Sequence, residues 1–469
     1  MMKYCILSPQ CKLRGWIGFP HALVHEGNVK RLSRDEFNAL LLCDGQTDTE
    51  TIEQKQVLDT LRSFEEKGIV RFCDHPEEME REQYYYHYDN RYIHDVYWSI
   101  TGKCNFNCRH CYLNAPDAAM GEMSHEEAMS VIDQMAECGV YHLLISGGEP
   151  FVRKDFWELV DHVIEKGIKI DQIYTNGYML TDSMLDKFEE RGIKPQFSIS
   201  FDGVDWHDWM RGVSGAEQAT LNAMRRCYLR GFRIAVEMCV HQGNADSIRE
   251  TVDVLYDSGV RDIKFCEVSG TELWKKNAAG NDMSRQEYIE AVLRYIPYFF
   301  EDGMPMNLLF GGVVELYKGS TDYRLIAEFE DGTEKCLDCY ICGAVRRSCY
   351  VAPDGRLLPC MPIASVPDQS MFPMIQETGL KEALKDSIFM DFARKKVKDL
   401  IDECQTCREC PYHLHCGGGC RAAAVIEGEK NLMGPDPFRC VMWKEGYVQK
   451  VHKACDEAIR KYCRKHESA

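Results

Sequence analysis

The amino-acid sequence predicts an α/β protein with three parts: a partial β/α barrel of six units, a small N-terminal domain and a cysteine-rich C-terminal domain. From about residue 94 to 310, strand-like and helix-like segments alternate, which is typical of parallel strands joined by crossover helices. Between Cys336 and Cys440 there are eleven cysteines, a density that no hydrophobic core requires. We place the domain boundaries at 1–90, 91–310 and 311–469.

The N-terminal segment begins with a strand-like stretch and continues with two helices. Residues 32–45 predict a capped helix that ends near Gly45, and a second helix leads toward Gly68 and a short β segment. Strand, helix, helix and β segment is the order of a small winged-helix domain. The acidic run 77–82, followed by Tyr84, Tyr85 and Tyr86, predicts a linker to the barrel.

The barrel segment contains six predicted strands with amphipathic helices between them. Ser124 and Glu127 form a capping-box pair that opens a helix ending near Gly139. The predicted strands cover residues 96–101, 142–146, 170–175, 196–201, 234–240 and 263–268.

Three cysteines follow the first strand in the spacing C-x3-C-x2-C: Cys104, Cys108 and Cys111. Their place predicts a site at the carboxyl ends of the strands, where barrels and open α/β sheets hold their chemistry. Three thiolates on one loop leave one iron of a four-iron cluster open to another ligand. A zinc knuckle is the alternative, but a closed zinc site requires a fourth nearby ligand.

Other strand ends carry further candidate residues. Gly147, Gly148 and Glu149 follow the second strand, where glycines let a ligand approach the backbone and Glu149 offers an acceptor. Thr175-Asn176-Gly177 follows the third strand and Ser200-Phe201-Asp202-Gly203 the fourth. Arg211 suits a planar carboxylate, or is a surface residue on a helical turn.

The cysteine loop and these strand ends resemble the radical S-adenosylmethionine (SAM) enzymes, whose partial barrel also has six units. The resemblance implies that the methionine part of SAM chelates the open iron and that the reduced cluster cleaves SAM to a 5′-deoxyadenosyl radical. That radical removes hydrogen from unactivated carbon, while the protein supplies positioning and shielding. By resemblance, the residues that contact the cofactor are His110, Gly147, Gly148, Glu149, Asn176, Ser200, Asp202 and Arg211.

The C-terminal cysteines follow a second spacing rule. Twelve residues separate Cys342 from Gly355, and four separate Gly355 from Cys360. The run Cys407-x2-Cys410-x5-Cys416-x3-Cys420 then leads over nineteen intervening residues to Cys440. This resembles the twin-cluster extension called SPASM, found on radical enzymes that modify peptides and proteins. Two auxiliary four-iron four-sulfur clusters are implied, which makes three clusters in all. Carried over by position, the ligands are Cys336, Cys342, Cys360 and Cys420 for the first, and Cys407, Cys410, Cys416 and Cys440 for the second.

Alternatives stay open for this field. Zinc ribbons also use C-x2-C pairs. Cys339, Cys349 and Cys404 have no assigned role; Cys339 could replace Cys336, and Cys404 could pair with Cys407 in a shifted frame.

The N-terminal segment resembles the winged-helix domains that bind leader peptides in peptide-maturation systems. In those relatives the leader adds as a strand to an exposed sheet edge. The implied partners are a precursor peptide with a leader and a flavodoxin- or ferredoxin-type electron donor. A structural cap or a nucleic-acid-type winged helix is the alternative.

Composition narrows the class of partner and the compartment. The chain has 469 residues, 45% of them apolar, and a formal charge of −18, which disfavours binding to nucleic acid. No segment resembles a signal peptide or a membrane span. We expect a cytoplasmic protein with no membrane partner, in which many of the 24 cysteines are cluster ligands rather than disulfides.

The leading hypothesis for the reaction is thioether formation, from cysteine sulfur to carbon, in a ribosomally made peptide. Carbon–carbon or ether cross-linking is not separable from it by sequence. Oxidation of a sulfatase Cys or Ser to formylglycine is disfavoured. The enzymes that carry it out have an Asp that serves as the base directly after this cysteine, whereas here Met361 follows Cys360. A non-catalytic metal-binding regulator is a further alternative. No catalytic base can be named from the sequence.

Overall fold

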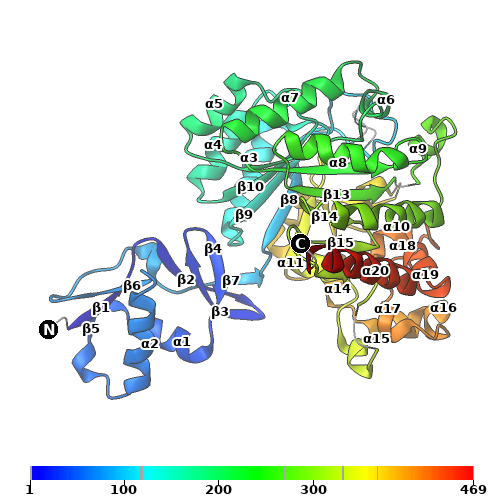
Figure 1. Ribbon diagram of the computed structural model, residues 1–469. Coiled ribbons are helices and arrows are strands. Elements are labelled where there is room, and N and C mark those ends of the chain that lie inside the picture. The colour runs from blue at the N-terminus through cyan, green and yellow to red at the C-terminus, as the bar shows by residue number, and fades with distance from the viewer. Residues whose placement is uncertain are drawn as a thin grey trace.

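The computed structural model describes residues 3–113, 115, 120–268, 270–329, 332–366 and 368–467. An α/β barrel sheet forms the centre, a small N-terminal domain lies to one side, and short helices rich in cysteine cover another side (Figure 1). This confirms the predicted fold class. Among the described helices, none carries an apolar stretch long enough to cross a membrane.

The N-terminal domain contains two sheets and two helices. Its three-stranded sheet has the order β5-β1-β6 and its four-stranded sheet the order β4-β3-β2-β7. The elements are β1 (Tyr4–Leu7), β2 (Cys11–Ile17), β3 (Phe19–His25), β4 (Asn28–Arg31), α1 (Arg34–Leu41), β5 (Asp44–Asp48), α2 (Lys55–Glu65), β6 (Val70–Cys73) and β7 (Tyr86–Arg91). Ser33 caps α1 in a capping box with Glu36, and this helix ends at Leu41, before Gly45. The strands β2 to β4 are an addition that the sequence did not reveal.

The predicted linker is instead part of this domain. Gln83 is buried, and its side-chain amide donates to the carbonyls of Leu7 (2.7 Å) and Ser8 (3.2 Å). The Arg14 guanidinium donates to the carbonyls of Glu82 and Tyr84. Strand β7 then pairs in parallel with β2. The linker prediction is wrong because main-chain carbonyls of this segment satisfy a buried guanidinium, a contact that charge patterning does not show.

The central sheet has eleven strands in the order β16-β15-β14-β13-β12-β11-β10-β9-β8-β17-β18. Strands β8 to β14 are parallel, and β17 pairs in parallel with β8. The six predicted strands correspond to β8 (Asp95–Ser99), β9 (His142–Ser146), β10 (Lys169–Thr175), β11 (Gln196–Ser200), β12 (Ile234–Val240) and β13 (Asp262–Glu267). Strands β14 (Asn307–Phe310), β15 (Val314–Leu316), β16 (Tyr323–Leu325), β17 (Ser348–Val351) and β18 (Leu357–Leu358) extend the sheet.

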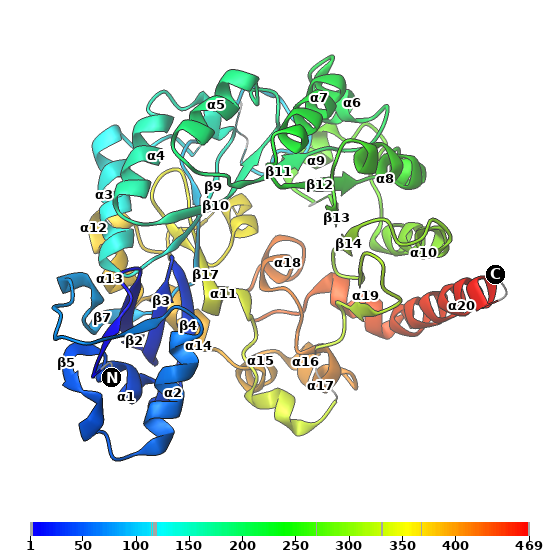
Figure 2. The same cartoon turned by 60° about the vertical axis from the view of Figure 1, so that its left-hand side comes forward.

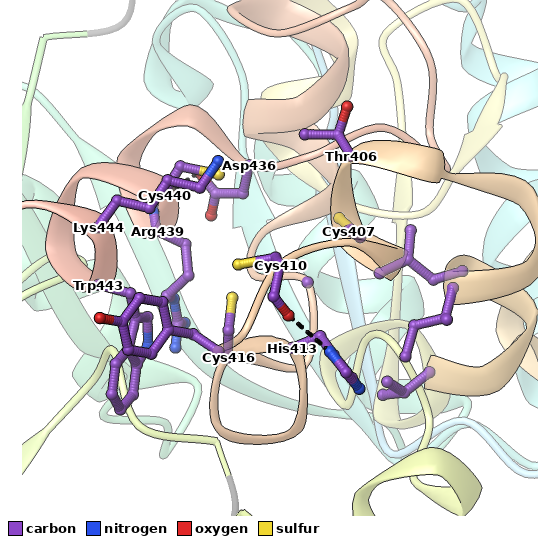
Figure 3. Close-up of a pocket in the computed structure, with 15 residues that line it drawn as sticks. Thr406, Cys407, Cys410, His413, Cys416, Asp436, Arg439, Cys440, Trp443 and Lys444 are labelled. Carbon is purple, nitrogen blue, oxygen red and sulfur yellow. Dashed lines mark hydrogen bonds between the residues drawn. The ribbon is translucent and has the colours of Figure 1, made fainter.

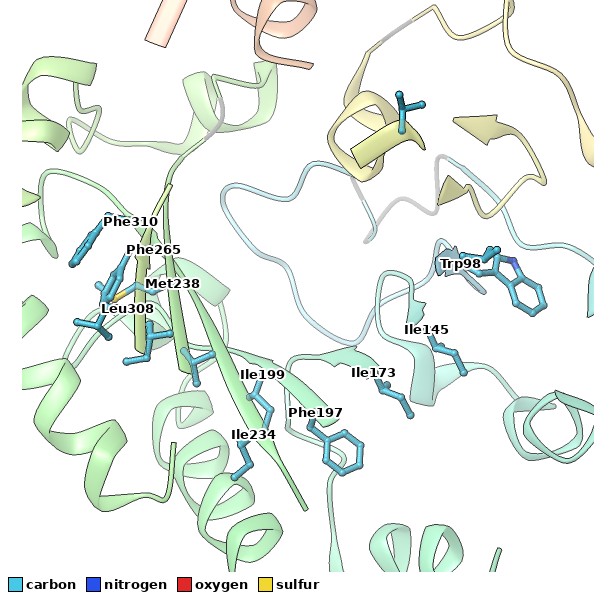
Figure 4. Packing of buried hydrophobic residues seen from close by; sticks show 14 of the residues in the cluster. Trp98, Ile145, Ile173, Phe197, Ile199, Ile234, Met238, Phe265, Leu308 and Phe310 are labelled. Atoms are coloured by element: carbon cyan, nitrogen blue, oxygen red, sulfur yellow. The ribbon is translucent and has the colours of Figure 1, made fainter. Parts of the chain in front are cut away.

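Helices cover the outer face of this sheet. They are α3 (His125–Glu137), α4 (Phe156–Glu165), α5 (Asp182–Glu190), α7 (Ala216–Leu229), α8 (Ile248–Asp257) and α10 (Arg285–Glu301). The short helices α6 (His207–Arg211) and α9 (Glu272–Asn277) follow β11 and β13 at the carboxyl ends of the strands. Ser124 caps α3 in the predicted capping box with Glu127. Buried side chains such as Ile145, Ile173 and Phe197 form the core between sheet and helices (Figure 4).

Alternation along the strands leaves polar groups on the inner face. In β12, Val236 and Met238 are buried toward the helices, whereas Glu237 and Cys239 are only partly buried. Because successive side chains of a strand point to opposite faces, Glu237 and Cys239 face the inside of the barrel. The interior is therefore partly polar and open rather than a closed hydrophobic core.

The C-terminal part consists mostly of short helices beside the barrel. Its helices are η6 (Glu334–Asp338), α11 (Ala344–Arg347), η7 (Met361–Ser365), α12 (Ile375–Thr378), α13 (Leu380–Ala383), α14 (Ile388–Arg394), α15 (Val397–Glu403), α16 (Gln405–Arg408), α17 (His413–Cys416), α18 (Arg421–Ile426), α19 (Pro437–Lys444) and α20 (Tyr447–Glu467). Figure 2 shows α15 to α17 below the barrel, and α20 packs beside α10, where Lys461 pairs with Glu301. Strand β17 joins this part to the barrel, and the Tyr350 hydroxyl donates to Ser99 Oγ at 2.7 Å.

Candidate functional site

A cavity of about 200 Å³ lies at the carboxyl ends of the parallel strands. It brings together residues from four strand ends, the cysteine loop and the C-terminal domain. Its described lining is Cys104, Phe106, Cys108, His110, Cys111, Tyr112, Leu113, Ala115, Ser146, Gly147, Gly148, Tyr174, Thr175, Asn176, Ser200, Arg211, Glu237, Cys239 and Met361. Six of the eight expected cofactor contacts therefore face one space, together with the three cysteines.

The cysteine loop is held in shape by backbone contacts. The amide of Phe106 donates to Cys104 Sγ at 3.4 Å, and that of Ala115 donates to Cys111 Sγ at 3.3 Å. The Arg109 amide donates to the Met210 carbonyl at 2.9 Å, which ties the loop to α6. Burial raises the pKa of the Cys104 thiol to about 12. A bound metal deprotonates a coordinating thiol outright, so three such thiols beside an open cavity fit an iron–sulfur cluster with one free iron.

Glu149 does not line the cavity. Its carboxylate is fully buried and accepts hydrogen bonds from Thr175 Oγ1 (2.9 and 3.0 Å) and from the Asn176 amide (2.8 Å). Burial raises the pKa of Glu149 to about 7. The carboxylate thus turns back to fix the loop after β10, and the expected contact of Glu149 with the cofactor stays a prediction.

Asp202 also lies behind the wall rather than in it. Its Oδ2 is 2.6 Å from Arg211 Nε, and its Oδ1 accepts from the Cys239 amide at 3.1 Å. Burial opposes ionisation of Asp202, but the Arg211 guanidinium outweighs it and the pKa lies below its usual range. Asp202 therefore positions Arg211, and its expected contact with the cofactor stays a prediction.

Arg211, the partner of Asp202, faces the cavity together with His110. Arg211 Nη1 lies 3.6 Å from Cys108 Sγ, so the guanidinium borders the expected cluster. Burial and the Arg211 charge lower the pKa of His110 to about 4, which keeps the ring neutral. His110 Nδ1 is buried and has no hydrogen-bond partner among the described residues. A polar atom in that state fits a site that a ligand completes.

The second C-terminal set of cysteines surrounds one pocket. Cys407, Cys410, Cys416 and Cys440 all line it, together with Trp443 (Figure 3). The four come from α16, the turn after it, α17 and α19. Four thiols around one space are a donor set that fits a fully protein-ligated cluster. Burial raises the pKa of Cys407, and a hydrogen bond with the thiol of Cys404 raises it further. Cys404 therefore lies next to this set.

The first C-terminal set is partly visible as a group. Burial raises the pKa of Cys360, and the nearby thiols of Cys420 and Cys342 raise it further. Cys336 lies buried on η6. Cys349 is separate from this set: it lies buried on β17, and its neighbouring thiol is Cys138 of the barrel. It is a core residue.

Ten of the lining residues were not among the predicted site residues, and they include Tyr174, Glu237, Cys239 and Met361. The first three occupy inward positions of β10 and β12, so strand alternation carried a signal for them. Met361 begins η7 of the C-terminal domain. Only the tertiary structure shows that the residue after Cys360 reaches the cysteine loop.

Two family models match the chain. Residues 98–255 match the radical SAM superfamily and residues 342–411 match SPASM, described as an iron–sulfur cluster-binding domain. Fold and site thus define a radical SAM enzyme that carries a SPASM domain. Such an enzyme uses SAM and a four-iron four-sulfur cluster, and its SPASM domain binds auxiliary iron–sulfur clusters.

Relatives and solved structures extend the likeness. Fe-coproporphyrin III synthase of Methanosarcina barkeri is 32% identical over 219 residues, which cover 46% of this chain and about half (54%) of that protein. Mycofactocin maturase MftC of Mycobacterium tuberculosis is 25% identical over 349 residues, 73% of this chain and 82% of that one. The structure of Streptococcus suis SuiB bound to precursor peptide SuiA has a TM-score of 0.63 at 16% identity and covers 93% of this chain and 99% of that chain, which shows a shared fold.

Gly148→Ala is expected to reduce SAM cleavage strongly. An added Cβ would lie 2.2 Å from the carbonyl oxygen of Lys103, beside Cys104, so the cysteine loop must move. A displacement of about 1 Å costs about 10²-fold in rate. The measurement is 5′-deoxyadenosine formation with dithionite. Gly343→Ala, with φ −67° and open space around its Cβ, is the matched control; equal rates for both variants would contradict the expectation.

Proposed function

We propose that this enzyme cross-links a ribosomally made precursor peptide through a carbon-centred radical, with a thioether from cysteine sulfur to carbon as the link. One observation carries the proposal: the cysteine loop, Arg211 and Met361 of the SPASM domain share one cavity. A radical formed there is within reach of the cysteine-rich domain. The names of two relatives support a peptide substrate, because MftC is a maturase and SuiB binds a precursor peptide.

A groove beside the cavity supports a peptide substrate. It has a volume of about 610 Å³ and is lined by α9 and the loop before it, by η7 and the segment after it, and by residues 425–432. Helix η7 borders both spaces, because Met361 lines the cavity and Ile363 and Ser365 line the groove. The wall of the groove includes Glu272, Lys275, Asp368 and Lys430 beside apolar side chains. Space of this size, with few charges among apolar groups, suits a short peptide segment.

The cofactor contacts form part of the proposal. His110, Gly147, Gly148, Asn176, Ser200 and Arg211 would bind SAM, with Arg211 on its carboxylate. Cys336, Cys342, Cys360 and Cys420 would hold one auxiliary cluster and Cys407, Cys410, Cys416 and Cys440 the other. A flavodoxin- or ferredoxin-type protein would supply the electron that starts cleavage.

The N-terminal domain would bind the leader of the precursor. Its two small sheets end in the strands β5 and β6 and in the strands β4 and β7, whose outer edges have no strand partner among the described residues. An open edge can accept a peptide as an additional strand through main-chain hydrogen bonds. The likeness to SuiB supports this role, since it covers nearly the whole chain.

Other reactions are less well supported. Formylglycine formation would require a base at position 361, and the thioether of Met361 accepts no proton. Carbon–carbon and ether cross-links share the same cavity chemistry and are separated by the experiment below. The 32% identity to Fe-coproporphyrin III synthase favours synthesis of an iron porphyrin as a second candidate. A non-catalytic regulator would have no use for the shared cavity.

The test is the mass of a short cysteine-bearing peptide encoded beside the gene, co-expressed with the enzyme without oxygen, before and after thiol alkylation. Loss of two hydrogens together with one alkylatable thiol per link is the expected result. Loss of two hydrogens with every thiol still reactive would show a carbon–carbon or ether link. An unchanged peptide with SAM still cleaved, and formation of Fe-coproporphyrin III from a porphyrin precursor instead, would replace the proposal by the second candidate.

Cys360→Ala is expected to spare SAM cleavage and impair product formation. Cys360 belongs to the proposed auxiliary set, yet Met361 beside it lines the cavity, so this cluster is the nearer route for the surplus electron. The measurement is the ratio of 5′-deoxyadenosine to cross-linked peptide, which should rise. Cys349→Ala, which alters a buried thiol of the same domain outside both sets, is the control. An unchanged ratio in Cys360→Ala would remove the electron-transfer role.

A further inference from the structure

The proposed cross-linking requires a proton acceptor, and the inference below rests on that function. A thioether, a carbon–carbon bond and an ether all form with loss of one hydrogen atom, one proton and one electron from the peptide. The 5′-deoxyadenosyl radical takes the hydrogen atom. A side chain that reaches the substrate must take the proton.

The cavity offers one carboxylate among its described lining residues, that of Glu237. Glu237 lies on the inner face of β12, between Ser200 of β11 and Lys264 of β13 in the strand register. Ser200 also lines the cavity. Glu237 therefore stands where the cofactor space meets the interior of the barrel.

The surroundings of Glu237 suit a base that a substrate can reach. Its Oε1 lies 3.1 Å from Lys264 Nζ, and the two side chains are 38% and 46% exposed. The ammonium holds one carboxylate oxygen, while the exposure leaves the second oxygen accessible to a ligand. Tyr174 and Tyr97, whose rings lie 6.3 Å apart, and the thiols of Cys239 and Cys266 face the same interior.

The other candidates in or near the cavity have other duties. Glu149 and Asp202 are fully buried and bonded to protein groups. His110 sits inside the cysteine loop. Burial and the charge of Asp202 raise the pKa of Cys239 well above its usual value, so this thiol keeps its proton. We propose that Glu237 is the catalytic base that accepts the substrate proton during cross-link formation.

For a thioether the atoms and electrons balance as follows. A carbon–hydrogen bond of the peptide breaks, and its hydrogen atom completes 5′-deoxyadenosine. The S–H bond of the substrate cysteine breaks, its proton passes to Glu237, and the sulfur bonds to the carbon. One electron remains, and an oxidised iron–sulfur cluster, which Cys336, Cys342, Cys360 and Cys420 would hold, would accept it. Glu237 then returns the proton to water through the open interior.

The test compares Glu237→Gln, Glu237→Ala and Glu237→Asp with the wild type in the fully loaded enzyme. Glu237→Gln keeps the shape of the side chain but cannot accept the proton, so cross-linking should fall by about 10²-fold or more. Iron content, SAM affinity by equilibrium dialysis and SAM cleavage should stay near wild-type values. Formate added to Glu237→Ala should restore product, which a purely structural role does not predict. Glu237→Asp should retain part of the activity.

Asp262→Asn is the matched control. Asp262 lies at the amino end of β13, away from the cavity, and accepts a hydrogen bond from the Asn307 side chain. This variant should cross-link at the wild-type rate. Cross-linking by Glu237→Gln at the wild-type rate would overturn the assignment. So would joint loss of SAM affinity and cleavage in Glu237→Gln, because Glu237 would then serve the cofactor. If the wild type itself cleaves SAM without linking any peptide, the proposed function fails, which is seen without any variant.

Discussion

Simultaneous replacement of Cys104, Cys108 and Cys111 by alanine is expected to abolish reductive cleavage of SAM. The three thiols line the cavity and are the only cysteines of their loop, so no cluster with an open iron can form without them. Iron should fall to about two-thirds of the wild-type content, because three clusters of equal size leave two. The measurements are 5′-deoxyadenosine after dithionite reduction and iron per protein after anaerobic reconstitution.

The matched control for this variant is Cys138→Ala combined with Cys227→Ala. Both thiols lie buried on the outer, helix-covered side of the barrel, away from the cavity. This control should keep all of its iron and its cleavage activity. Complete loss of iron in the triple variant would show that the SPASM clusters depend on the barrel cluster and would contradict independent sites.

Asp202→Ala is expected to lower the free energy of unfolding by about 3–5 kcal/mol, because it leaves the Arg211 guanidinium buried without its partner. Asp202 is fully buried, and Arg211 is 8% exposed. Cleavage of SAM should fall as well, since Arg211 would lose its fixed position beside Cys108. The measurements are thermal unfolding of the anaerobic protein and SAM affinity.

A double variant distinguishes the cost of leaving one buried charge unpaired from the net contribution of the ion pair. Asp202→Ala with Arg211→Met removes both charges and fills the space with a flexible apolar chain, so it should be more stable than Asp202→Ala alone. Arg191→Ala, which breaks an exposed pair with Asp161, is the surface control and should cost less than about 1 kcal/mol. A cost for Asp202→Ala as small as for this surface variant would refute the role given to the buried pair.

The barrel was predictable because its signals are local. Each of the six predicted strands lies within two residues of an observed one, since an apolar alternation and a following turn mark its ends. The cysteine fields were predictable because cluster ligation requires fixed spacings. Strands β14 and β17 were missed, because a few apolar residues after a turn do not reveal which distant strand they will pair with.

The direction of single side chains was beyond reach for a related reason. Glu149 and Asp202 were predicted as ligand contacts, and both turn into the protein to hold Asn176 and Arg211. Which way such a carboxylate turns depends on donors brought in by other strands. Glu237 was missed although alternation places it inside the barrel, because its importance follows from neighbours that the fold supplies.

The parallel pairing of β17 with β8 limits how this enzyme can be taken apart. Strand β8 leads into the cysteine loop, and β17 belongs to the C-terminal domain. A fragment that ends near residue 310 would expose the edge of β8 with unpaired N–H and C=O groups, a template for aggregation. A barrel that is exchanged between relatives should therefore include residues 348–358, because β17 completes the sheet beside β8. The unit that can be exchanged is thus longer than the segment 91–310 that the sequence motifs delimit.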